Sequence, residues 1–258
     1  HKNDLQGELD QIIAERNQVN TKQNPQDTRN MFEMPVESNN KDMKIKYQEI
    51  QDNPIVENFS YKFIKRIIDI ILGIILLLFF IPIYSIIGIL IKTTSIGPVF
   101  YNWHVVGKNG VPFNSWKFRT MVPKADEIKI NLSDKNEMVG PVFKIENDPR
   151  ITKVGRFLRK YSLDESIQFV SVIKGDMSLV GPRPAGPIEL EGYKEWQKRR
   201  LSVMPGLTGP WQVSGRNKIN HFDDWVKLDL KYIDNWSLWL DIKILFKTIP
   251  AAFSGTGM

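Results

Sequence analysis

The sequence predicts an α/β fold that is rich in helix and is anchored to a membrane by a re-entrant helix. An apolar segment runs from Ile70 to Ile91, short extended stretches flank a turn at Lys108–Gly110, and later stretches repeat apolar residues at helical spacing. We therefore expect short strands together with several interfacial amphipathic helices. The chain of 258 residues divides into a leader over 1–60, a membrane helix over 61–95 and a main domain over 96–258.

The apolar segment contains 22 consecutive residues without a charge. As a straight helix it would measure about 33 Å, which exceeds the roughly 30 Å hydrocarbon core of a bilayer. It is too long, and too far from the amino end, for a cleaved signal peptide. Pro82 lies in its middle and removes a helical hydrogen bond, so we expect a kink or a break there.

Positive charge flanks this segment on both sides. The basic residues are Lys62, Lys65 and Arg66 before it, and Lys92 and Lys108 after it. Since basic flanks favour the cytoplasm, both ends are expected on the cytoplasmic side. Together with Pro82, this predicts a helix that is broken near the proline and enters and leaves by the same face. A kinked single span is the alternative on these residues alone.

Composition excludes several classes of protein. The chain has no cysteine, so disulfide frameworks, thiolate zinc sites, iron–sulfur clusters and cysteine nucleophiles are excluded. The three histidines lie too far apart for a helical metal motif. Residues 1–60 carry net charge −4 and the remainder +10, which indicates a polyanionic neighbour for the main domain.

The leader is acidic and is expected to be partly helical. Leu5, Leu9, Ile12 and Ile13 have helix-like spacing, and a polar, largely irregular stretch follows them. Because the first residue is His1 and not Met, we expect the chain to be trimmed, processed or part of something longer. The leader contains no catalytic motif.

The segment Ser162–Glu165 allows two interpretations. Locally it is a capping box, with Ser162 at the N-cap of a helix, Glu165 at its third position and Gly175 beyond its end. In that arrangement Asp164 lies in the first turn, where the helix macrodipole favours the ionised carboxylate. The same carboxylate is then available as a nucleophile.

Cations near this acidic pair favour the functional interpretation. The basic helix over Val154–Tyr161 precedes the pair, a rigid Gly-Pro-Arg-Pro turn follows it, and a predicted hairpin supplies further charge. The side chains we expect to contact phosphate oxygens are Lys117, Arg119, Arg156, Arg159 and Arg183. Carboxylates among such cations are typical of phosphoryl transfer with Mg²⁺, although no Walker A loop, dinucleotide fingerprint or kinase signature is present.

Taken together, the motifs resemble those of bacterial monotopic phosphoglycosyl transferases over residues 63–258. The motifs are Phe63–Asp69, Gly97–Val99, Lys117–Met121, Arg150–Thr152, Gly155–Arg156, Ser162–Glu165, Lys174–Ser178, Gly181–Pro184, Pro205–Gly209, Gln212–Arg216 and Trp236–Trp239. The resemblance implies transfer of a sugar-1-phosphate from a UDP-sugar to a polyprenyl phosphate, with release of UMP. It also places the chain in the bacterial cytoplasmic (inner) membrane, with its catalytic domain on the cytoplasmic face.

The resemblance also implies residue roles. The aspartate that matches Asp164 forms a covalent phosphosugar intermediate, and the glutamate that matches Glu165 is associated with Mg²⁺ and with activation of the acceptor. Arg183 falls in the nucleotide-binding motif. Further expected substrate contacts are Gln168, Pro184 and Arg216. Membrane lipid is an expected partner, nucleic acid is not, and a homodimer is left open.

Departures from the family pattern bear on the membrane helix and on specificity. Ile81 replaces the usual Ser before Pro82, and Ser166–Phe169 replaces Leu-Pro-Gln-Leu while keeping the Gln. The Trp211–Arg216 segment resembles members that transfer a hexose-1-phosphate, so we expect galactose or glucose.

A catalytically inactive, membrane-attached interaction protein of polysaccharide assembly is the alternative. A basic nucleic-acid-binding protein, suggested by a pI of about 9.3, fits the apolar segment poorly.

Overall fold

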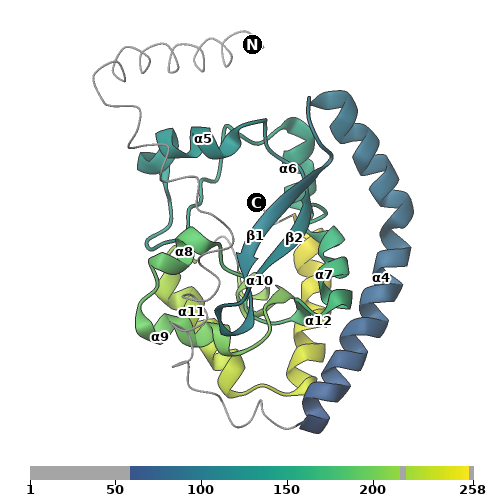
Figure 1. The fold of residues 1–258 in the computed structure, drawn as a ribbon, viewed down its shortest axis with the longest axis vertical. Helices are drawn as coiled ribbons and strands as arrows, with labels where there is room; N and C mark the ends of the chain where they lie inside the picture. Colours follow the sequence, from purple (N-terminus) through teal and green to yellow (C-terminus); the bar gives the residue numbers. More distant parts are fainter. Residues whose placement is uncertain (1–58, 216–218, 256–258) are drawn as a thin grey trace. The chain divides into compact units, whose positions relative to one another are not determined.

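The computed structural model describes residues 59–215 and 219–255, so the predicted leader lies outside the described residues except at its last two positions. Two small sheets lie within a helix-rich domain, with one long helix along its side (Figure 1). This confirms the predicted α-rich α/β class. The α-helices are α4 (Phe59–Thr94), α5 (Ala125–Lys129), α6 (Lys153–Lys160), α7 (Phe169–Lys174), α8 (Pro187–Glu191), α9 (Glu195–Lys198), α10 (Pro210–Val213), α11 (Phe222–Asp234) and α12 (Leu238–Phe253).

The strands are short, as expected. They are β1 (Phe100–Val106), β2 (Pro112–Phe118), β3 (Ser178–Val180) and β4 (Gly206–Thr208), and 3₁₀ turns occur at η3 (Lys108–Gly110), η4 (Ile130–Lys135), η5 (Ser166–Gln168) and η6 (Arg199–Ser202). Strands β1 and β2 form an antiparallel hairpin that pairs Phe100 with Phe118, whereas β3 and β4 are parallel. Asn109 adopts a left-handed conformation with φ 54° at the hairpin turn. The predicted hairpin is confirmed.

Helix α4 is continuous through Pro82, so the predicted break in the helix is wrong. The ribbon instead bends near its middle (Figure 1). Proline lacks the N–H that would bond to the preceding turn, and its ring crowds that turn, which bends a helix without ending it when the neighbouring bonds hold. Of the described helices, α4 is the one long and apolar enough to cross a membrane.

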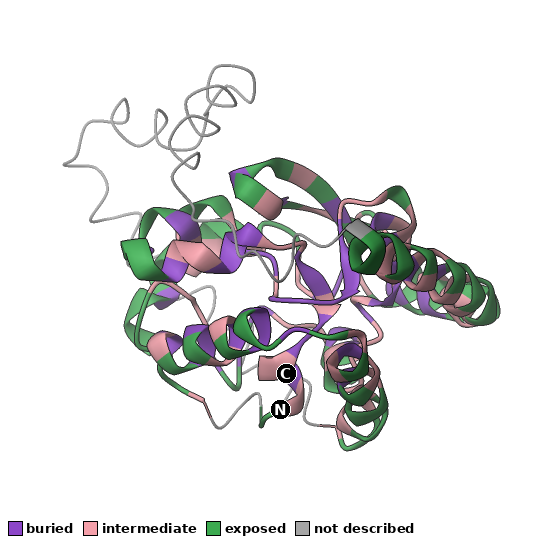
Figure 2. Ribbon diagram, turned by 90° about the horizontal axis from the view of Figure 1, so that it is seen from below, coloured by how far each residue is buried: buried purple, intermediate pink, exposed green. Residues whose placement is uncertain are grey.

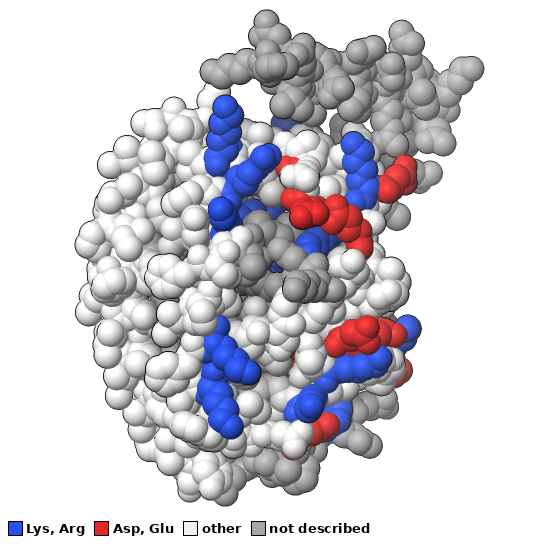
Figure 3. All heavy atoms as spheres, turned by 180° about the vertical axis from the view of Figure 1, so that it is seen from behind, with Lys and Arg blue, Asp and Glu red and all other residues white. Residues whose placement is uncertain are grey.

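One side of α4 packs against the domain and the other is exposed (Figure 2). Leu76 and Phe80 contact the core beside α7, and Ile87 and Ile91 are buried near the far end of the helix. The exposed side is apolar and includes Leu78, Phe79, Ile86 and Ile89. A broad surface without charge covers this side of the molecule, on the left in Figure 3. Such a surface suits contact with lipid.

The beginning of α4 is fastened to the domain by its charged residues. The Lys65 ammonium donates to Asp241 of α12 at 2.6 Å, and the Arg66 guanidinium donates to two carbonyls at the end of α7. The Asp69 carboxylate accepts the N–H of Leu179 at 3.0 Å. These three residues therefore bind protein groups and do not face lipid.

The end of α4 is held by the hairpin. Arg119, which follows β2, donates to the carbonyls of Ser95 and Ile96 at 3.0 and 2.6 Å and to the Ser95 hydroxyl at 2.8 Å. Both ends of α4 thus contact the same domain.

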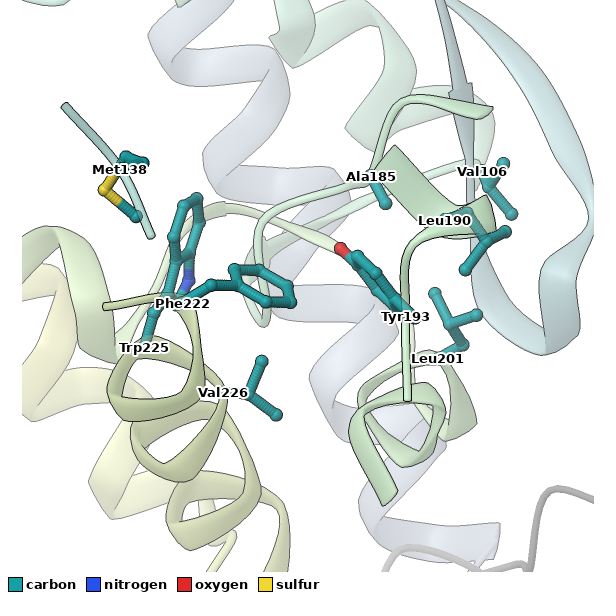
Figure 4. Close-up of a cluster of buried hydrophobic side chains, with 9 residues drawn as sticks. All are labelled: Val106, Met138, Ala185, Leu190, Tyr193, Leu201, Phe222, Trp225 and Val226. Atoms are coloured by element: carbon teal, nitrogen blue, oxygen red, sulfur yellow. The ribbon is translucent and has the colours of Figure 1, made fainter. Parts of the chain in front are cut away.

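A buried cluster of α8, η6 and α11 supports the far side of the domain (Figure 4). Tyr193, Phe222 and Trp225 lie around the guanidinium of Arg200, at 5.4 to 5.8 Å from their ring centres. Arg200 also forms an ion pair of 2.7 Å with Asp229, and both side chains are almost fully buried. The cluster therefore encloses a buried ion pair.

Candidate active site

A cavity of about 600 Å³ lies among the β1–β2 hairpin, the turn before α7 and the loop before α8. Its size is that of a site for a small molecule or nucleotide. Residues that bear charge or aromatic rings and line it include Tyr101, Trp103, Lys117, Arg119, Asp126, Phe143, Arg150, Arg159, Asp164, Glu165, Arg183, Trp211 and Trp225. The end of the cavity at Gly97 and Pro98 adjoins the end of α4.

The acidic pair lies in a turn and not in a helix, so the capping-box interpretation of Ser162–Glu165 is wrong. Ser162 has φ 56°, a left-handed conformation that an N-cap does not adopt, and helical structure begins only at Ser166. Asp164 is held through its backbone, because its carbonyl accepts the N–H of Phe118 at 2.9 Å. The C-cap prediction is confirmed, since Gly175 ends α7 with φ 98°.

Glu165 pairs with two cations across the cavity. Its Oε1 accepts from the Lys117 ammonium at 2.6 Å and lies 3.5 Å from Nη1 of Arg183. Lys117 comes from β2 and Arg183 from the loop after β3, so three separate segments meet here. Glu165 therefore contacts two protein cations and also lines the cavity that a ligand would enter.

The electrostatics of Asp164 differ from the sequence expectation. Burial raises the pKa of the Asp164 carboxyl and the neighbouring Glu165 raises it further, while Arg159 and Lys117 act in the opposite direction. The predicted influence of a helix macrodipole does not apply, because Asp164 precedes the helical residues. A carboxyl with a perturbed pKa in a cavity beside cations is typical of a catalytic site.

The pKa of Lys117 is lowered, whereas that of Asp164 is raised. Burial lowers the pKa of its ammonium to about 8, although the charge of Glu165 partly offsets this, and Arg183 lowers it further. The ammonium lies 3.4 Å from the ring centre of Trp103, and the guanidinium of Arg183 lies 5.0 Å from the same ring. Trp103 was not predicted from the sequence, where its alternation with Tyr101 along β1 is the only signal that indicates it.

The structure brings Lys117, Arg159 and Arg183 to the acidic pair as predicted. Nε of Arg159 donates to the Thr120 hydroxyl at 2.9 Å, which orients the side chain at the cavity wall. Arg119 also lines the cavity, but its guanidinium is engaged with the end of α4, so its interpretation as a phosphate ligand needs correction.

Three predicted substrate contacts do not line this cavity, and one cannot be placed. Arg156 is exposed on the outer side of α6, because the helix turns its Gly155 and Leu158 face inward. Gln168 is buried at the end of η5, and Pro184 is buried where it stiffens the Arg183 loop. Arg216 lies outside the described residues.

The loop that carries Arg183 is held by a residue that sequence analysis missed. Nη2 of the buried Arg200 donates to the Arg183 carbonyl at 3.0 Å, and Nη1 donates to the Tyr193 hydroxyl at 2.6 Å. Burial raises the pKa of its partner Asp229 to about 6. Arg200 stands in a run of basic residues that looks solvated, so no signal in the sequence distinguishes it.

The acidic pair offers two of the ligands that a Mg²⁺ ion needs. No cluster of three acidic or histidine side chains that could hold a metal occurs among residues 59–215 and 219–255. Mg²⁺ commonly uses one or two carboxylates together with substrate phosphate oxygens and water. Asp164 and Glu165 are adjacent carboxylates in the cavity, so the residues present fit a magnesium ion that arrives with a diphosphate.

A buried carboxylate, a second acid and cations suited to phosphate thus meet in one cavity. The chain belongs to the bacterial sugar transferase family, whose model matches residues 60–255. This confirms the family resemblance.

Three relatives illustrate the match. Galactosyl transferase CpsE of Streptococcus agalactiae is 53% identical over 161 residues, which are 62% of this chain and 36% of that protein. Exopolysaccharide production protein ExoY of Rhizobium meliloti is 44% identical over 198 residues, 75% of this chain and 87% of that protein. The UDP-glucose:undecaprenyl-phosphate glucose-1-phosphate transferase of Escherichia coli is 39% identical over 199 residues, 74% of this chain and 40% of that protein. The chain therefore spans less than half the length of CpsE and of the Escherichia coli transferase, and most of the length of ExoY.

Proposed function

We propose that this chain transfers a hexose-1-phosphate from a UDP-sugar to undecaprenyl phosphate and thereby initiates exopolysaccharide synthesis. The observation that carries the proposal is the buried Asp164 beside Glu165, with Lys117 and Arg183 in the same cavity. The names of the relatives supply the donor and acceptor classes. The exposed apolar side of α4 supports a lipid acceptor, because it brings the site next to a membrane.

The proposed reaction has two displacement steps at one phosphorus atom. A carboxylate oxygen of Asp164 attacks the phosphorus that bears the sugar, the bond to the bridging oxygen breaks, and UMP leaves with that electron pair. A phosphate oxygen of the acceptor then attacks the same phosphorus, and the bond to Asp164 breaks to restore the carboxylate. One site can therefore serve a water-soluble donor and a lipid acceptor in turn.

The neighbouring residues have distinct proposed roles. Lys117 and Arg183 bind the diphosphate oxygens and stabilise the charge that gathers on the departing UMP. Arg159 favours the ionised, attacking form of Asp164. Glu165 would hold Mg²⁺ together with Asp164, and the ion, when bound, would neutralise diphosphate charge. Glu165 also orients Lys117.

A panel of donors tests the proposed specificity. We expect the purified chain to release UMP with UDP-galactose or UDP-glucose in the presence of undecaprenyl phosphate, because the relatives named above include a galactosyl and a glucose-1-phosphate transferase. UMP would be measured for each UDP-sugar with and without the lipid. Turnover with a UDP-diacetamido sugar alone would contradict the hexose assignment, and no UMP with any donor would favour an inactive interaction protein.

We also propose that α4 is re-entrant and that both of its ends face the cytoplasm at the inner membrane. Lys65 and Arg66 bind the domain at one end of the helix, and Ser95 is bound by Arg119 at the other. A helix that crossed the bilayer would carry one of these ends away from the domain that holds it. The contacts therefore support a shared side.

Labelling in sealed vesicles tests this topology. Because the chain has no cysteine, Lys62→Cys and Lys108→Cys each introduce a single thiol, one on each side of the apolar segment. We expect an impermeant maleimide to label both variants from the same side of the membrane. The unsubstituted chain is the blank, and labelling from opposite sides would show that α4 spans the bilayer.

A further inference from the structure

A second hollow lies outside the catalytic cavity, on the end of α4 nearest the hairpin. It measures about 450 Å³, is open to the surface and is lined almost entirely by apolar atoms. Tyr84, Gly88 and Ile89 of α4 form one wall, and Val99 and Phe100 at the start of β1 form the other. We call this hollow the α4–β1 groove.

The α4–β1 groove adjoins the catalytic cavity through one aromatic side chain. The ring of Phe118 lies 5.4 Å from that of Tyr84 and 5.2 Å from that of Phe100, both of which line the groove. Phe118 also lines the catalytic cavity, and its N–H donates to the carbonyl of Asp164. Phe118 is therefore the side chain that separates the groove from the acidic pair.

The segment between α4 and β1 contributes residues to both hollows. Gly97 and Pro98 line the catalytic cavity, and the next two residues line the groove. Lys92 adds a cation at the groove, one turn of α4 beyond Gly88. An open apolar groove with a cation beside it, adjacent to a cavity lined by cations, matches a long hydrocarbon chain that ends in a phosphate.

Gly88 keeps the groove open. A Cβ atom at this position would meet Val99 at 3.7 Å, which is an ordinary contact, so the helix backbone does not require glycine here. A larger side chain would instead occupy the hollow itself. Position 88 is therefore a place where the groove can be filled without disturbing the core.

We propose that the α4–β1 groove binds the isoprenoid chain of the acceptor next to its phosphate, and that the phosphate enters the catalytic cavity past Gly97 and Pro98. This assignment rests on the proposed function. Apolar walls on α4 and β1 bind the chain, while Lys92 attracts the anionic end. The groove thus discriminates acceptors by their hydrocarbon chain.

Filling the groove tests the assignment. In the full chain, Gly88→Phe should raise KM for undecaprenyl phosphate by about tenfold or more, and should leave kcat/KM for a short monoterpenyl phosphate and the acceptor-free release of UMP unchanged. The matched control is Ile86→Phe, which adds the same ring on the exposed side of α4, outside the groove. Equal loss with both acceptors, or the same loss in the control, would overturn the assignment.

Photolabelling gives a readout that does not depend on turnover. A polyprenyl phosphate with a diazirine near its phosphate should label the peptide that contains Val99 and Phe100, and undecaprenyl phosphate should compete while phosphatidylglycerol should not. Labelling without any transferase activity would contradict the proposed function and support the groove. Equal competition by phosphatidylglycerol would show a general lipid contact and overturn the groove, whatever the activity.

Discussion

Asp164→Asn should reduce turnover by about 10⁴-fold or more and should abolish both the acceptor-free release of UMP and the trapped phosphosugar adduct. The amide keeps the shape of the side chain but cannot act as the carboxylate nucleophile. UMP release and mass spectrometry of the protein after exposure to UDP-hexose would measure the two losses. Asp134→Asn, a change at an exposed acid away from the cavity, should behave like the unsubstituted chain.

Thermal unfolding separates this loss of chemistry from a loss of folding. Burial and Glu165 raise the pKa of Asp164, so the folded state disfavours its charge. Asn carries no charge, and Asp164→Asn should therefore unfold at the same temperature as the unsubstituted chain or at a higher one. Normal turnover would refute the covalent mechanism, and a lower unfolding temperature would attribute the loss to structure.

Glu165→Gln should reduce turnover by about 10²- to 10⁴-fold while the fold is retained. Glutamine could replace glutamate in a capping box, so the capping interpretation predicts little effect. In the structure Glu165 precedes η5, but its side chain makes no capping hydrogen bond and pairs instead with Lys117 and Arg183. The substitution therefore removes a charge and not a cap. Activity and unfolding temperature, measured on the same preparation, would decide between the two interpretations.

The pH dependence of kcat/KM gives a second readout of Glu165→Gln. Lys117 has a pKa of about 8, so its charge is present below that pH and is lost above it. Binding of the anionic donor, and with it kcat/KM, should fall through this range. Because the charge of Glu165 raises the pKa of Lys117, the substitution should move the alkaline fall to lower pH. An unmoved profile would show that Lys117 does not control it.

The sequence predicted those elements whose signals are local. The hairpin follows from extended stretches around Lys108–Gly110, and the end of α7 follows from Gly175. Ser162–Glu165 has the residue types and spacing of a capping box, but the backbone at Ser162 is left-handed, which spacing alone does not reveal. In the structure the Asp164 carbonyl accepts the N–H of Phe118 in β2, a long-range contact that no local pattern encodes.

The candidate site was predictable in its residue types but not in its geometry. Motif grouping identified Asp164, Glu165 and Arg183 together, and the structure brings them into one cavity. The same grouping gave Arg119 a substrate role, although its guanidinium binds the end of α4. Arg200 was missed because its contacts with Arg183 and Asp229 join positions 17 and 29 residues apart. Whether a basic side chain binds substrate or holds another part of the protein depends on tertiary contacts.

The fastening of α4 has a consequence for the order in which the protein is made. Asp241, which binds Lys65, lies 176 positions later in the chain. At about 5–20 residues per second, a ribosome needs roughly 10–35 s to travel from one to the other. During that interval the apolar helix exists without the partner that neutralises its lysine. Its first encounter is therefore with lipid or a chaperone, and the domain closes on a helix that is already in place.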